Sequence, residues 1–231
     1  MFSVAAARLR LRELTRRAQV LQRTEWTTLL RDLCEQLHIR RPVALLQSAE
    51  NVMPMTWGWW RPVVLLPAEA TEWLPERRRV VLQHELAHVK RWDCLTRNIA
   101  SIVCAFYWFN PLVWLAGRRM CVERELACDD LVVIAGWKAS DYASHLVEIA
   151  RTFRRVPHVA AIAMARSSQL EQRVAAIVDV SRNRRLRPVT MLAVVVMTGG
   201  MVLSMGGGRT AAAPSDSETS KALRQQQIAR L

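Results

Sequence analysis

The spacing of apolar residues divides the chain into a helical start, a strand-rich region and a long helical region. In residues 24–38, "TEWTTLLRDLCEQLH", apolar positions recur at helical spacing, and Thr24 is suited to be the N-cap. Residues 42–67 contain short β-favouring runs that prolines and a glycine separate, which predicts two or three short strands. The pattern therefore predicts an α+β fold, mainly α, with a small β-sheet.

The next region predicts two helices joined by an Asn-Pro pair. Residues 98–117 contain no charged residue and would be long enough to span a membrane. Asn110 and Pro111 interrupt this stretch, and Asn followed by Pro is typical of a helix start. We therefore expect an apolar helical hairpin over about 93–135, with Asp93 as the N-cap of its first helix. Its tip is expected to be buried in protein or to dip into a membrane surface.

The C-terminal part of the chain predicts a membrane segment. Residues 182–188 are rich in arginine, and the residues from Val189 to Met205 are uncharged. Arginines beside an apolar segment favour the cytoplasmic side. We expect a basic juxtamembrane segment at 182–188, one transmembrane helix at 189–205 and a disordered tail at 206–231 outside the membrane. A buried core helix is the alternative for 189–205.

Charge and cysteine content narrow the partners and the compartment. The net charge of +13 suits either nucleic acid or the anionic inner leaflet of a membrane. No recognised DNA-binding motif accompanies this charge, so a membrane rather than nucleic acid is the expected partner. The five cysteines form no C-x-x-C pair, which is typical of a reducing, cytosolic compartment. Residues 1–23 are expected to form a basic arm.

The candidate chemistry lies in residues 80–93, "VVLQHELAHVKRWD". On a helix, residues i and i+4 share one face, so His84 and His88 could bind one metal ion. Glu85 directly follows the first histidine and could accept a proton from metal-bound water. The H-E-x-x-H pattern therefore predicts a helix over about 76–91 that binds one Zn²⁺ ion. Charged residues flank the motif on both sides, which argues against an intramembrane protease.

Catalytic zinc usually has three protein ligands, and the hairpin supplies candidates for the third. The outward helix would be about 24 Å long, and the returning helix would reach Glu125 after about 21 Å, level with the histidines. Asp129 lies one turn further on the same face, where it could hold the second nitrogen of a ligand histidine. Cys128 shares this face, whereas Glu123 points about 160° away from Glu125. All of them remain candidates, with Glu125 favoured.

Three separated motifs, "HELAHVKRWD", "YWFNPLVW" and "RELACDD", together resemble the integral-membrane zinc metallopeptidases of the β-lactam sensor/signal-transducer (antirepressor) type. The resemblance covers roughly residues 26–173 and includes "PMTWG" and "RPVVLLP". It implies a zincin-like cytoplasmic domain in which His84 and His88 bind zinc and Glu85 is the catalytic base. It also implies that Glu125 completes the site within an E-x-x-x-D motif that ends at Asp129. The family's earlier transmembrane helices and its extracellular sensor have no counterpart in this sequence, so we expect a shortened member.

These observations together predict a membrane-associated zinc endopeptidase with its catalytic domain at residues 24–181. We expect it at the inner (cytoplasmic) membrane, where it would act on a protein or peptide in regulatory proteolysis or signal transduction. An extended substrate is expected to pair with an edge strand formed by Met55, Thr56, Trp57 and Gly58. The alternative is a non-catalytic basic module that binds membrane or DNA and has a structural or vestigial zinc site. The sequence leaves open the substrate, the inducing signal and the oligomeric state.

Overall fold

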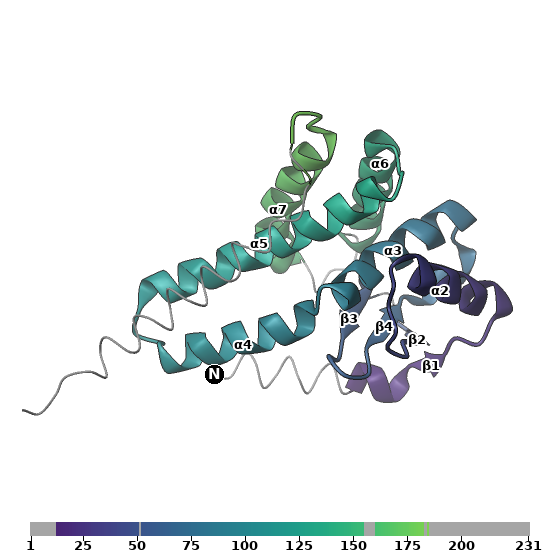
Figure 1. Ribbon diagram of the computed structural model, residues 1–231, viewed down its shortest axis with the longest axis horizontal. Helices are drawn as coiled ribbons and strands as arrows, with labels where there is room; N and C mark the ends of the chain where they lie inside the picture. The colour runs from purple at the N-terminus through teal and green to yellow at the C-terminus, as the bar shows by residue number, and fades with distance from the viewer. Residues whose placement is uncertain (1–12, 51, 155–159, 183, 185–231) are drawn as a thin grey trace, which may run out of the picture. The chain divides into compact units, whose positions relative to one another are not determined.

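The computed structural model describes residues 13–50, 52–154, 160–182 and 184, all within one compact unit of the chain, residues 1–184 (Figure 1). These residues are mainly helical with one small mixed sheet, so the predicted α+β class is confirmed. The strands are β1 (Gln19–Val20), β2 (Ala44–Gln47), β3 (Met55–Trp57) and β4 (Val63–Leu66). The helices are α2 (Thr24–Gln36), the 3₁₀ helix η1 (Ala68–Glu72), α3 (Pro75–Lys90), α4 (Asp93–Phe106), α5 (Pro111–Ile134), α6 (Ala139–Arg154) and α7 (Ala160–Val178).

The sheet has the strand order β1-β2-β4-β3, so β3 lies at one edge. Strand β2 pairs in parallel with β4, and β3 pairs antiparallel with β4. Strand β4 is the apolar centre, because Val64, Leu65 and Leu66 are fully buried. Strand β1 lies within residues 1–23, where the sequence predicts only a basic arm. A two-residue strand gives no periodic signal, so its pairing with β2 could not be foreseen.

Helix α3 is the central element of the core. From Val80 to Val89 every residue is buried except His84 and His88, which remain partly accessible. A helix that is covered on all sides is typical of the middle of a domain. Its neighbours include α2, α5 and strand β3 (Figure 1). The two histidines therefore mark the one face of this buried run that opens to a site.

The junction between α3 and α4 depends on an unusual residue, Trp92. Its backbone is left-handed, with φ of 60°, which costs a non-glycine residue about 1–2 kcal/mol. Arg41 offsets this cost, because its guanidinium lies 3.5 Å from the centre of the Trp92 ring. The same guanidinium donates hydrogen bonds to the backbone carbonyls of Trp59 and Val89. These contacts fix the sharp turn that brings the next residue, Asp93, back towards α3.

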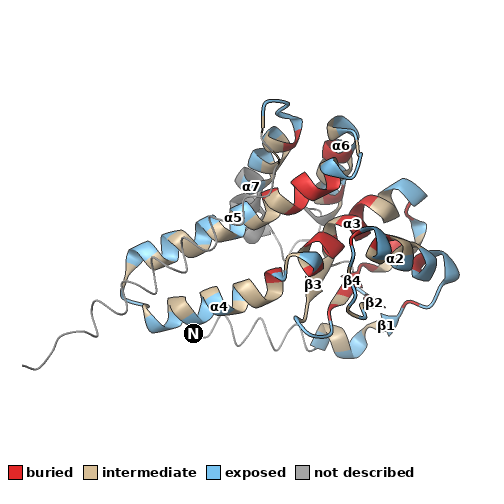
Figure 2. Ribbon diagram, in the orientation of Figure 1, coloured by how far each residue is buried: buried red, intermediate tan, exposed pale blue. Residues whose placement is uncertain are grey.

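Helices α4 and α5 form a long hairpin that extends away from the sheet (Figure 1). Asn110 is the N-cap of α5, and its side-chain oxygen accepts a hydrogen bond from the backbone N–H of Leu112 at 2.9 Å. In the described part of the chain, no residue from Cys94 to Glu125 is buried (Figure 2). The described part of the chain therefore does not bury the hairpin tip.

The membrane segments expected from the sequence fall largely beyond the described residues. None of the helices at 13–50, 52–154 and 160–182 is long and apolar enough to cross a bilayer. Residues 189–205, the expected transmembrane helix, and the tail at 206–231 lie outside the described residues, as does most of the basic segment 182–188.

Candidate metal centre

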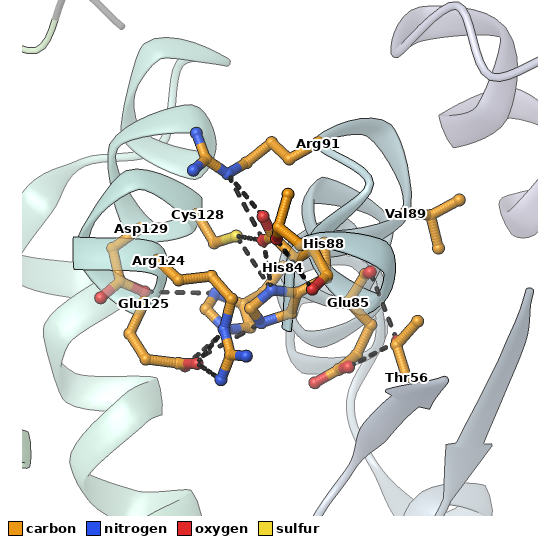
Figure 3. A network of polar contacts seen from close by, with 12 residues as sticks. Thr56, His84, Glu85, His88, Val89, Arg91, Arg124, Glu125, Cys128 and Asp129 are labelled. Carbon is orange, nitrogen blue, oxygen red and sulfur yellow. Dashed lines mark hydrogen bonds and ion pairs between the residues drawn. The ribbon is translucent and has the colours of Figure 1, made fainter. Parts of the chain in front are cut away.

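Three of the expected metal ligands come together between α3 and α5 (Figure 3). The Oε2 atom of Glu125 lies 3.8 Å from His84 Nε2 and 3.9 Å from His88 Nε2. Ligand atoms around a tetrahedral zinc ion are roughly 3.3 Å apart, given zinc–ligand bonds of about 2.0–2.1 Å. A contraction of about half an ångström would therefore suffice for binding. A set of two histidines and one glutamate is that of several catalytic zinc sites, so the residues fit Zn²⁺.

The two oxygens of Glu125 have separate partners. Oε1 accepts a hydrogen bond from Arg124 at 3.0 Å, whereas Oε2 faces the two histidines. Glu123 instead points to the surface, where it pairs with Arg119 at 2.9 Å. The geometry thus brings Glu125 into the site and leaves Glu123 out of it.

Each histidine has a carboxylate on the side away from Glu125. His84 Nδ1 lies 3.2 Å from Asp129 Oδ1, and His88 Nδ1 lies 2.8 Å from Asp93 Oδ2. A carboxylate at Nδ1 fixes the ring orientation and leaves Nε2 free for a metal ion. The Asp129 carboxylate thus lies beside the second ring nitrogen of His84. Asp93 does not cap α4 as expected, because the N-cap is Trp92 and the Asp93 carboxylate turns towards His88.

Two residues that the sequence does not predict for the site hold Asp129 in place. Arg173, from α7, donates two hydrogen bonds of 2.7 Å, one to each carboxylate oxygen of Asp129. Tyr142, from α6, donates its hydroxyl to Asp129 Oδ1, and its oxygen lies 3.0 Å from His84 Nδ1. Arg173 also lies 3.6 Å from Glu125 Oε2. A lone arginine or tyrosine on a helix has no spacing that links it to the H-E-x-x-H motif, so no sequence signal could have found these two.

Cys128 lies next to His88, on the side of the ring that faces away from Glu125. Its sulfur is 3.2 Å from His88 Nδ1 and 3.4 Å from Asp93 Oδ2, so it contacts the histidine edge that faces away from Glu125. Burial and the nearby Asp93 carboxylate raise the pKa of the Cys128 thiol well above its usual value. The geometry thus favours Glu125 over Cys128 as third ligand.

Glu85 lies on the other side of the histidines, next to strand β3 (Figure 3). Its side chain is buried, and Oε2 accepts a hydrogen bond of 2.7 Å from the Thr56 hydroxyl. Thr56 belongs to the edge strand β3 together with Met55 and Trp57. Gly58 follows in a left-handed conformation, and a side chain there would meet the Arg61 carbonyl oxygen at 2.5 Å. The expected substrate strand therefore lies directly beside the expected base.

The charged groups of the centre shift one another's pKa values. Burial alone would lower the pKa of His84, but hydrogen bonds to Asp129 and Glu125 outweigh it and raise this pKa to about 9. Burial would raise the pKa of Glu125, but His84, His88 and Arg173 hold it well below its usual range. Arg173 and His84 likewise keep the pKa of Asp129 low despite its burial. Both carboxylates are therefore charged at neutral pH, and a metal cation would compete with the proton on His84.

The chain is similar to known regulatory proteins over part of its length. The chain is 30% identical to "Regulatory protein BlaR1" of Bacillus licheniformis over 138 residues, which are 60% of this chain and 22% of that protein. It is 24% identical to "Methicillin resistance mecR1 protein" of Staphylococcus aureus over 91 residues, 39% of this chain and 16% of that protein. The chain thus spans less than a quarter of the length of these relatives.

The sequence pattern of one protein family covers most of the chain. It matches residues 1–177, a range that includes α3, the hairpin and Arg173. Every side chain that meets at the centre described above thus falls within the matched region. The chain belongs to the BlaR1 peptidase M56 family.

Proposed function

We propose that the chain is a zinc-dependent endopeptidase of the zincin-like type that acts in regulatory proteolysis or signal transduction. One observation carries this proposal: His84, His88 and Glu125 converge on one point, and Glu85 is buried beside them. Zinc bound there would act as a Lewis acid and lower the pKa of a bound water molecule. The regulatory role is proposed because relatives bear the name regulatory protein.

Glu85 is the proposed general base. Its carboxylate would accept the proton of the attacking water and pass it to the departing amine. The hydroxyl of Thr56 fixes Oε2, which leaves Oε1 as the oxygen that exchanges the proton. This contact also aligns the base with strand β3, so the substrate and the base would be positioned by the same element.

The proposed substrate is an extended segment of protein that pairs with the free edge of β3. Among the residues that the structure describes, β3 pairs only with β4, and its other side would accept backbone hydrogen bonds from a substrate. Met55, Thr56, Trp57 and Gly58 would form the binding edge. We further propose that the chain works at the inner membrane, with this domain in the cytoplasm, the segment 189–205 as anchor and the tail outside.

A non-catalytic role is the second candidate, since the net charge of +13 would also suit a basic module that binds an anionic membrane or DNA. Its zinc site would then be structural or vestigial. The two candidates differ in whether the zinc-loaded chain hydrolyses peptide bonds.

Glu85→Gln tests the proposal directly. The amide cannot accept a proton, so peptide hydrolysis should fall by about 10²–10⁴-fold while the zinc content stays at one ion per chain. Zinc would be measured by metal analysis, and hydrolysis with a denatured protein substrate. Glu123→Gln is the matched control, because Glu123 lies at the surface and should leave both values unchanged.

Two outcomes would contradict the proposal. Full turnover in zinc-loaded Glu85→Gln would remove Glu85 from its role. A wild-type chain that binds zinc but cleaves no peptide would favour the non-catalytic module.

A further inference from the structure

The end of the α4–α5 hairpin is covered with exposed apolar side chains. We call six of them the apolar tip: Phe106, Trp108, Phe109, Leu112, Trp114 and Leu115. Their exposed fractions range from 48% to 76%. Large apolar side chains that cluster on a surface usually mark a site of interaction.

The apolar tip surrounds the hairpin rather than forming a stripe. Successive residues on a helix are about 100° apart, so Leu112 and Leu115 share one side of α5, whereas Trp114 points about 160° away from Leu112. A helix that binds a groove on a protein presents one apolar face. A helix that is apolar on all sides suits a medium that surrounds it, such as the hydrocarbon of a bilayer.

Several polar groups of the turn are paired within the hairpin. The N–H of Asn110 donates to the carbonyl of Tyr107 at 3.0 Å, and the indole N–H of Trp114 donates to the carbonyl of Trp108 at 2.9 Å. The Asn110 side chain caps the N–H of Leu112. Unpaired backbone groups are costly in hydrocarbon, so this internal pairing lowers the cost of inserting the turn into a membrane.

The dimensions of the hairpin fit one leaflet. The first charged residues on either side of the tip are the exposed Arg97 and Arg118. Arg97 lies nine residues before Phe106, about 13 Å along α4, and Arg118 lies seven residues after Pro111, about 10 Å along α5. One leaflet of hydrocarbon is about 15 Å thick, so the arginines would lie at the level of the headgroups. Positive side chains there favour anionic lipids.

We propose that the apolar tip inserts into one leaflet of an anionic phospholipid bilayer. The aromatic residues are suited to the boundary between hydrocarbon and headgroups, and the arginines would pair with lipid phosphates. This contact is separate from the expected anchor at 189–205, and it does not depend on the chemistry of the metal centre.

Photo-cross-linking in the full chain tests this proposal. Phe109 would be replaced by the photo-reactive aromatic amino acid p-benzoylphenylalanine, and the chain would be reconstituted in vesicles of phosphatidylglycerol and phosphatidylethanolamine. Ile134, which is also exposed but lies at the other end of α5, is the matched control position. We expect a lipid adduct from position 109, identified by mass spectrometry, and none from position 134.

Other occupants of the tip would give other products. A cross-link to residues 189–205 or to a second copy of the chain would overturn the proposal, as would equal lipid adducts from positions 109 and 134. Leu112 provides a second position in case the first variant has a lowered thermal unfolding temperature. Folded variants at positions 109 and 112 that both lack a lipid adduct would also overturn the proposal.

Discussion

Each histidine of the centre has its own carboxylate, Asp129 for His84 and Asp93 for His88. This symmetry means that both rings are fixed in orientation before a metal ion binds, so little side-chain entropy is left to lose on binding. The two carboxylates come from different helices, α5 and the start of α4. The precision of the centre therefore depends on the hairpin as much as on the H-E-x-x-H helix.

Substitution of each candidate residue should change the zinc affinity according to the role of that residue. Glu125→Ala removes a ligand, so zinc should be lost at micromolar chelator. Asp129→Ala should weaken binding by roughly 10–100-fold, because it removes only the group that orients His84. Glu123→Ala and Cys128→Ala should stay near wild type. Competition with a fluorescent chelator measures all four, and an empty site in Glu123→Ala with zinc retained in Glu125→Ala would invert the assignment.

Zinc affinity should rise with pH. Without metal, the pKa of His84 is raised from 6.5 to about 9. The bound proton therefore stabilises the metal-free fold fully below pH 6.5, and this stabilisation is lost as the pH rises through about 9. Zinc must displace this proton, so its affinity should increase about tenfold per pH unit over the same window. Titrations at several pH values would measure the slope. Asp129→Asn should flatten it, and a wild-type affinity that does not change with pH would contradict the assigned coupling.

At the scale of elements, α7 is joined to the centre through Arg173. Its double hydrogen bond to the buried Asp129 links a helix late in the chain to one that carries a ligand. Removing the cation would take from the buried Asp129 carboxylate its closest charged partner and leave it only Tyr142 and His84, which is much costlier than breaking an exposed pair.

Arg173→Met should therefore destabilise the fold by roughly 3–5 kcal/mol, which for a chain of this size lowers the unfolding temperature by roughly 10 °C. Arg119→Met is the matched control, because it breaks the exposed pair with Glu123 and should cost little. Thermal unfolding of both variants without added metal gives the comparison. Equal unfolding temperatures would mean that Asp129 does not depend on Arg173.

At the scale of the whole molecule, the sequence predicts those features that lie on one element or at a regular spacing. The helix with His84 and His88, the Asn110 start of α5 and the return of Glu125 all follow from helix geometry and local capping. The contact of Asp93 with His88 could not be predicted, because it arises from the left-handed turn at Trp92. The contact of Arg173 with Asp129 could not be predicted either, because it arises from the packing of a distant helix. The sequence also could not predict whether the hairpin tip is buried in protein or meets a membrane surface, because exposure is a property of the folded chain.

The contact between Arg173 and the centre also has a consequence for the order of events during synthesis. Arg173 follows Asp129 by 44 positions, and ribosomes add about 5–20 residues per second, so Arg173 leaves the ribosome roughly 2–9 seconds after Asp129. During that interval the nascent chain already carries His84, His88, Glu125 and Asp129 but lacks the cation that balances them. We therefore expect the centre to be completed only after α7 has been made, and a translation product that stops before residue 173 to lack an intact centre despite having every expected metal ligand.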